Sequence, residues 1–104
     1  MEIKMLDEVG VFGEDKDKAQ ELRENKILPT LNKGEDVILN FGGVKSVTQS
    51  FMHALISKAI RDKGVVVLEK IYFKDCNEVV KEIIRIVTEY MQDPIGLDTK
   101  EKVK

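Results

Sequence analysis

The stretch that decides the fold is Val37–Phe51, which reads VILNFGGVKSVTQSF. Its first five residues form a short apolar run with one Asn, bounded by turn residues, which is typical of a strand buried on both faces. Two glycines then provide a loop, and the hydroxyl side chains of Thr48 and Ser50 stand where a helix begins. The order of strand, loop and helix predicts an α/β unit with polar side chains at the helix N-terminus.

The helix expected over residues 51–63 has the clearest pattern in the chain. His53, Ser57 and Arg61 recur every four residues on one side of it, which we expect to be exposed. Gly64 is a natural C-terminal stop. The apolar face, with the spacing of a helix that packs on a core, comprises Met52, Leu55, Ile56, Ala59 and Ile60.

Upstream of this unit, residues 3–12 predict one or two short strands, with a turn at Gly10 or Gly13. Residues 15–28 predict a charged helix that begins at acidic capping residues. Pro29 should end or kink that helix, because proline lacks an N–H group and restricts the residue before it.

Downstream, residues 65–73 predict either one kinked strand or two segments. The last helix is expected from Asp75 or Asn77 to Met91, since its charged residues recur at intervals of three and four. Asp75 and Glu78 resemble a capping box at its start. The complete order alternates strands and helices, which favours a layer of helices packed on a small mixed or parallel sheet.

The size and charge of the chain limit the classes of function. Its 104 residues suffice for one modest core, and 42% hydrophobic with 35% charged residues is typical of a globular protein. The net charge of -2 creates no strong field for nucleic acid or an acidic membrane, so we expect neither as a partner. We expect one domain over residues 1–92 and a polar, flexible C-terminal tail over residues 93–104.

The sequence predicts a cytoplasmic location. Cys76 is the single cysteine, so no intramolecular disulfide can form, which fits a reducing compartment. The N-terminus has no apolar core of signal-peptide length, and no apolar run approaches the roughly 18–20 residues that span a bilayer.

The sequence contains only weak signals for nucleotide binding, metal binding or catalysis. A phosphate loop needs Gly directly before its Lys, and Val44 occupies that position. His53 is the single histidine, and no spacing typical of metal ligands surrounds it, so we predict no metal ion and no cofactor. Cys76 precedes a helix N-terminus, which lowers thiol pKa values, so an enzyme that uses this thiol stays an open hypothesis.

Taken together, the chain resembles the STAS-like domain family of unknown function, which is related in fold to bacterial anti-sigma factor antagonists. The resemblance covers about residues 9–91 and implies an α/β fold with a small mixed or parallel sheet and about three helices. It rests on the strand Val37–Phe41, the loop residues Gly43-Val44 and Val47–Phe51, the segment Lys70–Asn77 and the helical segment Asp17–Arg23.

In the antagonists, the loop after this strand carries Asp-Ser-Ser/Thr-Gly, and a partner kinase phosphorylates the first Ser. The resemblance places Thr48 at the Asp, Gln49 at the phosphorylated Ser, Ser50 at the next hydroxyl and Phe51 at the Gly. The usual acceptor is therefore missing here, and a phosphorylation switch would need Ser50 or Thr48 in its place.

The resemblance implies a non-enzymatic, bacterial-type regulatory module that signals by binding a protein, with a histidine-kinase-like ATPase domain as the expected partner. The contact surface would be the loop 42–50 and the helix 51–63. A small-ligand or nucleotide sensor that uses the same loop and helix N-terminus is the alternative, and self-association into a homo-oligomer through an exposed sheet edge stays open. The candidate binding or regulatory residues are Ser46, Thr48, Gln49, Ser50, His53, Ser57 and Arg61.

Overall fold

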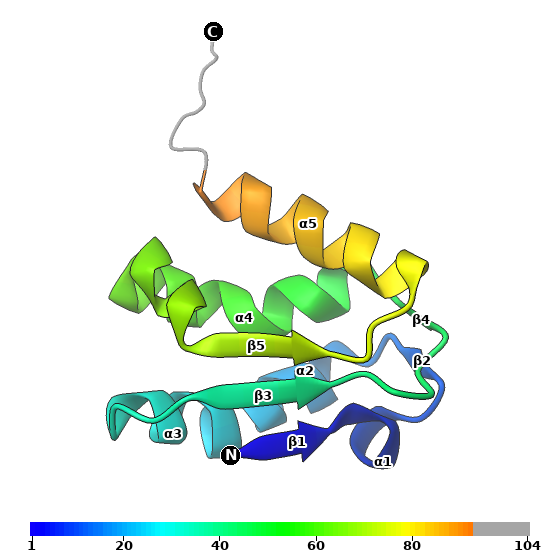
Figure 1. Cartoon of the computed structure of the whole chain (residues 1–104), viewed down its shortest axis with the longest axis horizontal. Helices are drawn as coiled ribbons and strands as arrows, with labels where there is room; N and C mark the ends of the chain where they lie inside the picture. Colours follow the sequence, from blue (N-terminus) through cyan, green and yellow to red (C-terminus); the bar gives the residue numbers. More distant parts are fainter. Residues whose placement is uncertain (93–104) are drawn as a thin grey trace, which may run out of the picture.

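Three parallel strands form the main sheet, in the spatial order β1–β3–β5 (Figure 1). The computed structural model describes residues 1–92. A separate pair of two-residue strands, β2 and β4, is also parallel and lies at the end of the molecule where the main strands finish. The strands are β1 Glu2–Lys4, β2 Phe12–Gly13, β3 Val37–Asn40, β4 Ser46–Val47 and β5 Ile71–Lys74.

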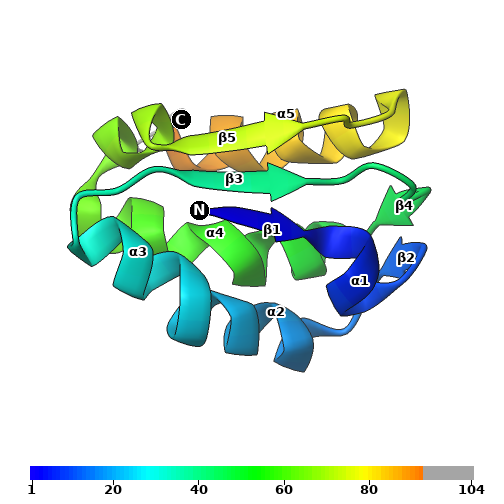
Figure 2. The same cartoon turned by 60° about the horizontal axis from the view of Figure 1, so that its bottom comes forward.

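Three long helical stretches pack on one face of the main sheet, as Figures 1 and 2 show together. The predicted α/β architecture, with helices packed on a small parallel sheet, is confirmed. The first stretch changes helix type twice, from α2 through the π-helical turn η1 to α3. The helical elements are α1 Met5–Val9, α2 Lys16–Leu22, η1 Arg23–Ile27, α3 Leu28–Asn32, α4 Gln49–Lys63, the 3-10 turn η2 Val65–Glu69, and α5 Glu78–Gln92.

The core lies between the sheet and the helices. The five apolar residues predicted to share one face of α4 are all buried, which confirms that face as the packing face. On the sheet side, Val37, Leu39 and Phe41 are fully buried. Because the core-facing residues of β3 alternate with polar or half-buried ones, the strand has the period of two expected for a one-sided sheet.

The prediction that β3 is buried on both faces is wrong. Ile38 and Asn40 are only half-buried, because among residues 1–92 the helices cover one face of the sheet (Figure 2). The uncovered face is polar: Asn40 Nδ2 donates to Glu2 Oε2 at 2.7 Å, and Lys74 Nζ lies 3.8 Å from the same carboxylate. Tyr72, in register with Ile38, is 50% exposed on this face.

The N-terminal segment differs in part from the prediction. Residues 2–4 form the expected strand, but residues 5–9 form the short helix α1, whose Met5 is buried in the core. Gly10 ends α1 with φ +78°, and its N–H donates to the carbonyl of Leu6 at 2.9 Å.

The helix does not end at Pro29, the first of the two outcomes predicted there, but a π-helical turn interrupts its α-helical geometry directly before this proline. The helix starts at the expected acidic cap, where Asp15 accepts hydrogen bonds from the N–H groups of Asp17 and Lys18, but it continues to Asn32. Within η1 the N–H of Leu28 donates to the carbonyl of Arg23, five residues back. This wider turn lets Pro29 enter the first turn of α3, where its missing N–H costs no hydrogen bond.

Two further corrections concern the segment before α5. Residues 65–69 form a 3-10 turn rather than a strand, with Val67 N–H donating to the carbonyl of Gly64 at 3.1 Å. Asp75 has φ +57° and does not cap α5. Asn77 is the cap, since its Oδ1 accepts the N–H of Val80 at 2.8 Å. The tail expected over residues 93–104 lies outside the described residues.

Candidate functional site

The N-terminus of α4 is held in place by Thr48. Its Oγ1 accepts the N–H of Phe51 at 3.0 Å, and its own N–H donates to the carbonyl of Gly13 in β2 at 2.9 Å. Thr48 therefore acts as a helix cap and as a link to β2. Gln49 and Ser50 follow in the first turn and are exposed, and their amide groups have no acceptor within the helix.

An open groove of about 620 Å³ runs along the side of α4 between α2 and α5. The first two turns of α4 form one end of the groove, and Arg61 marks the other end. α2 and α5 supply its two walls. The lining residues are Lys16, Gln20 and Arg23 of α2 and η1; Gln49, Ser50, His53, Ala54, Ser57 and Arg61 of α4; and Ile86, Val87 and Tyr90 of α5.

The groove is basic on its α2 side. Lys16 and Arg61 form no ion pair with another residue of the described chain, and no carboxylate is among the described lining residues. Arg23 is held in place, because its Nη1 donates to the carbonyl of Ala54 at 3.0 Å and its Nη2 pairs with Glu24 at 2.9 Å. The overall charge of -2 thus conceals a local concentration of cations.

The α5 wall is apolar and aromatic. Ile86 and Val87 contribute aliphatic surface, and the ring of Tyr90 lies 6.3 Å from the ring of His53 at an interplanar angle of 57°. Tyr90 is 71% exposed, so much of its ring is available to a bound molecule.

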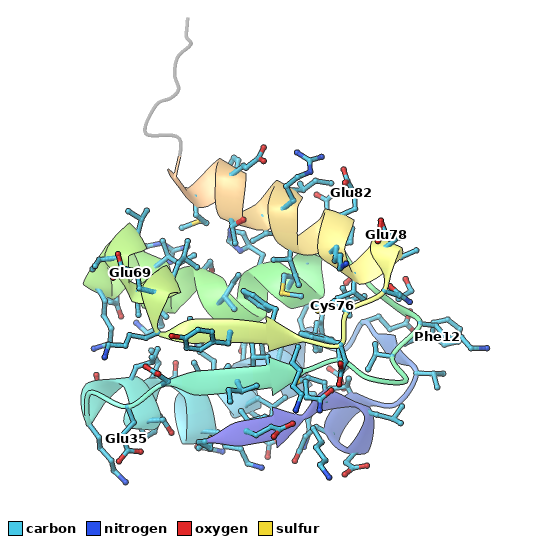
Figure 3. The ribbon with its side chains drawn as sticks, in the orientation of Figure 1. Phe12, Glu35, Glu69, Cys76, Glu78 and Glu82 are labelled. Carbon is cyan, nitrogen blue, oxygen red and sulfur yellow. The ribbon has the colours of Figure 1, made fainter. Side chains whose placement is uncertain are left out.

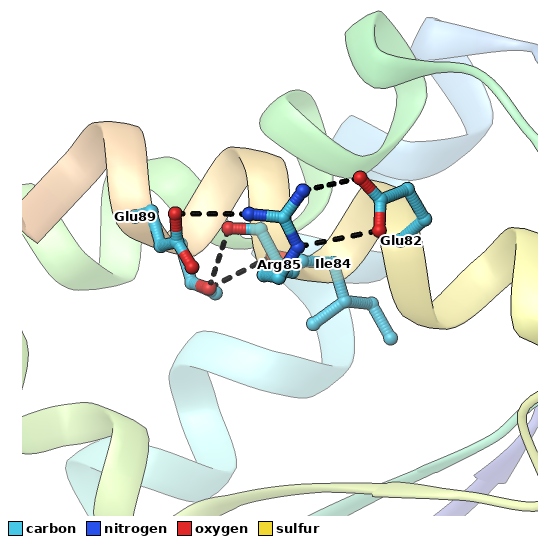
Figure 4. A network of polar contacts seen from close by, with 5 residues as sticks. Glu82, Ile84, Arg85 and Glu89 are labelled. Atoms are coloured by element: carbon cyan, nitrogen blue, oxygen red, sulfur yellow. Dashed lines mark hydrogen bonds and ion pairs between the residues drawn. The ribbon is translucent and has the colours of Figure 1, made fainter.

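The carboxylates of α5 are engaged elsewhere on that helix. Arg85 donates from Nη1 to Glu89 at 3.1 Å and from Nε to Glu82 at 3.2 Å, and its Nη2 also contacts Glu82 (Figure 4). The hydrogen bonds from Arg85 lower the pKa of Glu82. These contacts follow the predicted spacing of three and four residues and keep both carboxylates away from the groove lining.

The structure brings five of the seven candidate residues together in the groove. These five are Gln49, Ser50, His53, Ser57 and Arg61, whereas Ser46 and Thr48 lie outside its lining. The expectation that Ser57 is exposed is wrong, since only 4% of it is accessible. Ser57 is covered because α2 and α5 pack on both sides of α4, which a single-helix pattern cannot reveal.

Beside the groove, an exposed aromatic residue marks the end of the molecule that carries the loop 42–50. Phe12 in β2 is in register with Ser46 in β4 and is 56% exposed (Figure 3). Val11 is 41% exposed and Leu6 37%. We call Leu6, Val11 and Phe12 the apolar tip. An ideal Cβ on Gly43 would lie 2.8 Å from Leu6 Cδ2, so the tip adjoins the loop directly.

Sequence reasoning missed the apolar tip and both walls of the groove. The signal for Phe12 was slight, because β2 is two residues long and shows no alternation. Lys16 and Arg23 belong to the helix that was predicted only as charged, and Tyr90 to the last helix, which was predicted only from its charge spacing. Their meeting depends on helix packing and not on a local motif.

Cys76 lies between β5 and α5 and is half-buried (Figure 3). Burial raises the pKa of its thiol, which is the opposite of the lowering expected beside a helix N-terminus. Its Sγ lies 3.8 Å from the carbonyl oxygen of Lys74. Within residues 1–92 no group of His, Cys, Asp and Glu side chains has the arrangement of a metal site.

Comparison with known families decides the classification. The model of a family described as a STAS-like domain of unknown function (DUF4325) matches residues 18–81, more than half of the chain. The chain belongs to this family. The match runs from α2 through α4 to the first turn of α5, so the STAS-like segment contains most of the groove lining. No curated protein and no solved structure shows significant similarity to this STAS-like domain.

The described part of the STAS-like domain contains no helix with the length and apolar character needed to cross a membrane.

Proposed function

We propose that this STAS-like domain is a non-enzymatic regulatory module that binds a protein partner through the loop 42–50, the exposed side of α4 and the apolar tip. The observation that carries the proposal is the position of Phe12. A side chain of this size, 56% exposed beside Ser46, is available to fill a pocket on a partner. Aromatic residues supply much of the binding energy at protein interfaces.

The polar surroundings of the apolar tip fit a protein interface. Lys45, whose N–H bonds to Val11, is exposed, as are Gln49 and Ser50 at the start of α4, and these residues would form a polar rim around a buried aromatic anchor. The loop is held in one conformation by backbone hydrogen bonds from Lys45 N–H to the carbonyl of Val11 at 2.8 Å and from Thr48 N–H to Gly13 at 2.9 Å. A preformed surface loses little conformational entropy on binding.

The expected partner is a histidine-kinase-like ATPase domain in the cytoplasm of a bacterial-type cell. This part of the proposal rests on the family resemblance to anti-sigma factor antagonists, whose corresponding loop and helix contact such a domain. Domains of the STAS type are generally non-catalytic, and regulation by occupancy of a partner's surface needs no catalytic group.

Charge at Ser50 would regulate the contact. Gln49 stands where the antagonists carry their phosphorylated Ser, and Ser50 is the adjacent hydroxyl, exposed in the first turn of α4. A phosphate there would be favoured by the helix dipole and would add about two negative charges to the rim. The fold would be preserved while the docking surface changed.

The experiment is affinity capture from a lysate of the source cells, with tagged wild type, Ser50→Asp and Asn25→Asp. Asn25 is exposed in η1 and outside the groove lining, so its variant adds the same charge away from the proposed surface. We expect wild type and Asn25→Asp to capture an ATPase-domain protein and Ser50→Asp to lose it, with unchanged far-UV circular dichroism. If Ser50→Asp captured the same protein as strongly as wild type does, the proposed role of the loop would be wrong.

A further inference from the structure

We propose that the groove between α2, α4 and α5 binds a small phosphate-bearing molecule with a flat apolar part. The first observation is a buried hydroxyl. Ser57 is 4% exposed and lines the groove, yet its hydroxyl makes no hydrogen bond to another residue of the described chain. The hydroxyl of Thr88, by contrast, donates to the carbonyl of Ile84 at 2.8 Å in the usual helical manner.

An unpaired buried hydroxyl is unusual in a folded protein, because its transfer from water is compensated only by a hydrogen bond. The side of Ser57 that faces the groove is where such a bond can be made. A phosphate oxygen fits this position, since a hydroxyl can donate to it without any rearrangement of the helix.

The second observation is the charge around Ser57. Arg61 lies one turn further along α4, and helical side chains lean toward the N-terminus, which directs Arg61 toward Ser57. Arg23 reaches the same part of α4, because its Nη1 donates to the carbonyl of Ala54, one turn before Ser57. Arg23 and Arg61 thus line the same groove as this hydroxyl, and Arg61, which forms no ion pair with another residue of the described chain, has a guanidinium that can bind phosphate with paired hydrogen bonds.

The remaining lining supports an anionic ligand and opposes a cationic one. Lys16 and the N-terminal turn of α4 add positive potential at the other end of the groove. No carboxylate is among the described lining residues, and although Arg23 pairs with Glu24 at 2.9 Å, Lys16 and Arg61 form no ion pair with another residue of the described chain. Because the chain as a whole is negatively charged, an anionic ligand should be attracted to the groove and not to the rest of the surface.

The α5 wall defines the rest of the ligand. Tyr90 and His53 present two rings at an angle, next to the aliphatic side chains of Ile86 and Val87. A planar ring system can pack against such a wall. The volume of about 620 Å³ falls within the roughly 300–1,000 Å³ typical of small-molecule sites. A nucleoside monophosphate combines the two required chemistries and is the probe of choice. The groove shares Gln49 and Ser50 with the proposed docking surface, but the ligand site is tested through Ser57 and Arg61 and the docking through Phe12 and Ser50.

The test is binding of AMP, GMP, ribose 5-phosphate, inorganic phosphate and adenosine to the full chain, by calorimetry and thermal denaturation. We expect the monophosphates to bind and raise the Tm, with phosphate alone weaker and adenosine weakest. Ser57→Ala and Arg61→Gln should weaken the monophosphates about tenfold or more, because each removes a hydrogen bond to a charged group. Lys58→Gln is the matched control: Lys58 lies on α4 outside the groove and pairs with Asp62 at 3.1 Å.

The Ser57→Ala variant also shows whether the Ser57 hydroxyl serves ligand binding or the stability of the fold. Since the Ser57 hydroxyl has no partner within the described protein, its removal should leave the Tm of the unliganded chain unchanged or higher. If none of the four phosphate compounds bound or raised the Tm, the proposal would be overturned. So would undiminished binding by Arg61→Gln, equal losses in Arg61→Gln and Lys58→Gln, or adenosine binding as tightly as AMP. None of these outcomes bears on partner capture through Phe12 and Ser50.

Discussion

The side-chain amide of Asn77 donates a hydrogen bond to the backbone carbonyl of Lys45, with Nδ2 and O separated by 2.9 Å. The same Nδ2 lies 3.3 Å from the carbonyl of Val44, and Oδ1 accepts the N–H of Val80. One residue therefore caps α5 and anchors the loop that carries the proposed interface. The two segments are more than thirty residues apart in the sequence.

Asn77→Ala should lower the free energy of unfolding by about 2 kcal/mol, because it removes a helix cap and the hydrogen bonds to the loop. Asp15→Ala, which removes only the cap of α2, should cost about 1 kcal/mol. Urea denaturation of both variants gives the comparison. If Asn77→Ala cost no more than Asp15→Ala, the bonds to Val44 and Lys45 would contribute nothing.

Gly13→Ala should destabilise the junction of β2 and α4. An ideal Cβ at Gly13 would lie 2.9 Å from Val47 Cγ1 and 3.2 Å from Phe51 Cε2, and both neighbours are buried. We expect a loss of about 1–3 kcal/mol, typical of overpacking in a core. Thermal denaturation beside Glu14→Ala, an exposed neighbour, provides the control. An unchanged Tm in Gly13→Ala would show that this packing is loose.

Glu8 should make the free energy of unfolding depend on pH in the acid range. A hydrogen bond from Lys26 Nζ to Glu8 Oε2 at 3.0 Å is the main cause that lowers the pKa of Glu8, and Lys18 Nζ lies 3.5 Å from the other oxygen. A carboxyl whose pKa is lower in the folded state stabilises the protein above its unfolded pKa. That stabilisation is lost as the pH falls through the folded pKa.

Glu8→Gln should therefore cost about 0.5–1 kcal/mol at pH 7, a range set by partly exposed pairs. The difference from wild type should shrink as the pH falls below about 4, near the unfolded pKa of Glu. Urea denaturation at several pH values, with Glu14→Gln as control, measures it. A difference that stays constant down to pH 2 would exclude the ion pairs as its cause.

Cys76 should react slowly with iodoacetamide in the folded protein. Burial raises the pKa of its thiol, so less thiolate is present at pH 7.5 than in the unfolded chain. We expect alkylation, followed by mass spectrometry, to be slower in buffer than in concentrated urea at the same pH. Faster alkylation of the folded protein would instead favour the activated thiol that the sequence left open.

The sequence predicted the positions of α4 and β3 well, because their residues pack directly on the core, although β3 is buried on one face and not on both. The apolar spacing from Met52 to Ile60 reports a buried face, and that face is buried. The turns were predicted less well. Val65 and Val66 favour strand by propensity, but Gly64, with φ +85°, redirects the chain, and both valines are exposed in η2. In this segment, the backbone conformation at Gly64 outweighs the strand propensity of the two valines.

The site was predictable only where one helix supplies it. The spacing of His53, Ser57 and Arg61 correctly grouped them, but the burial of Ser57 depends on α2 and α5, which the pattern of α4 does not contain. Phe12 became part of the candidate interface only through the pairing of β2 with β4. Contacts between segments distant in sequence leave little trace in the local pattern of either segment.

The most direct test of the proposed function compares partner binding by Phe12→Ser and Tyr72→Ser. Both residues are half-exposed aromatics, but Tyr72 lies on the uncovered face of the main sheet, away from the loop 42–50. With the protein captured by wild type, calorimetry should give an affinity about tenfold or more weaker for Phe12→Ser, as for an interface anchor, and unchanged for Tyr72→Ser. Equal affinity of Phe12→Ser and wild type would contradict the proposed interface.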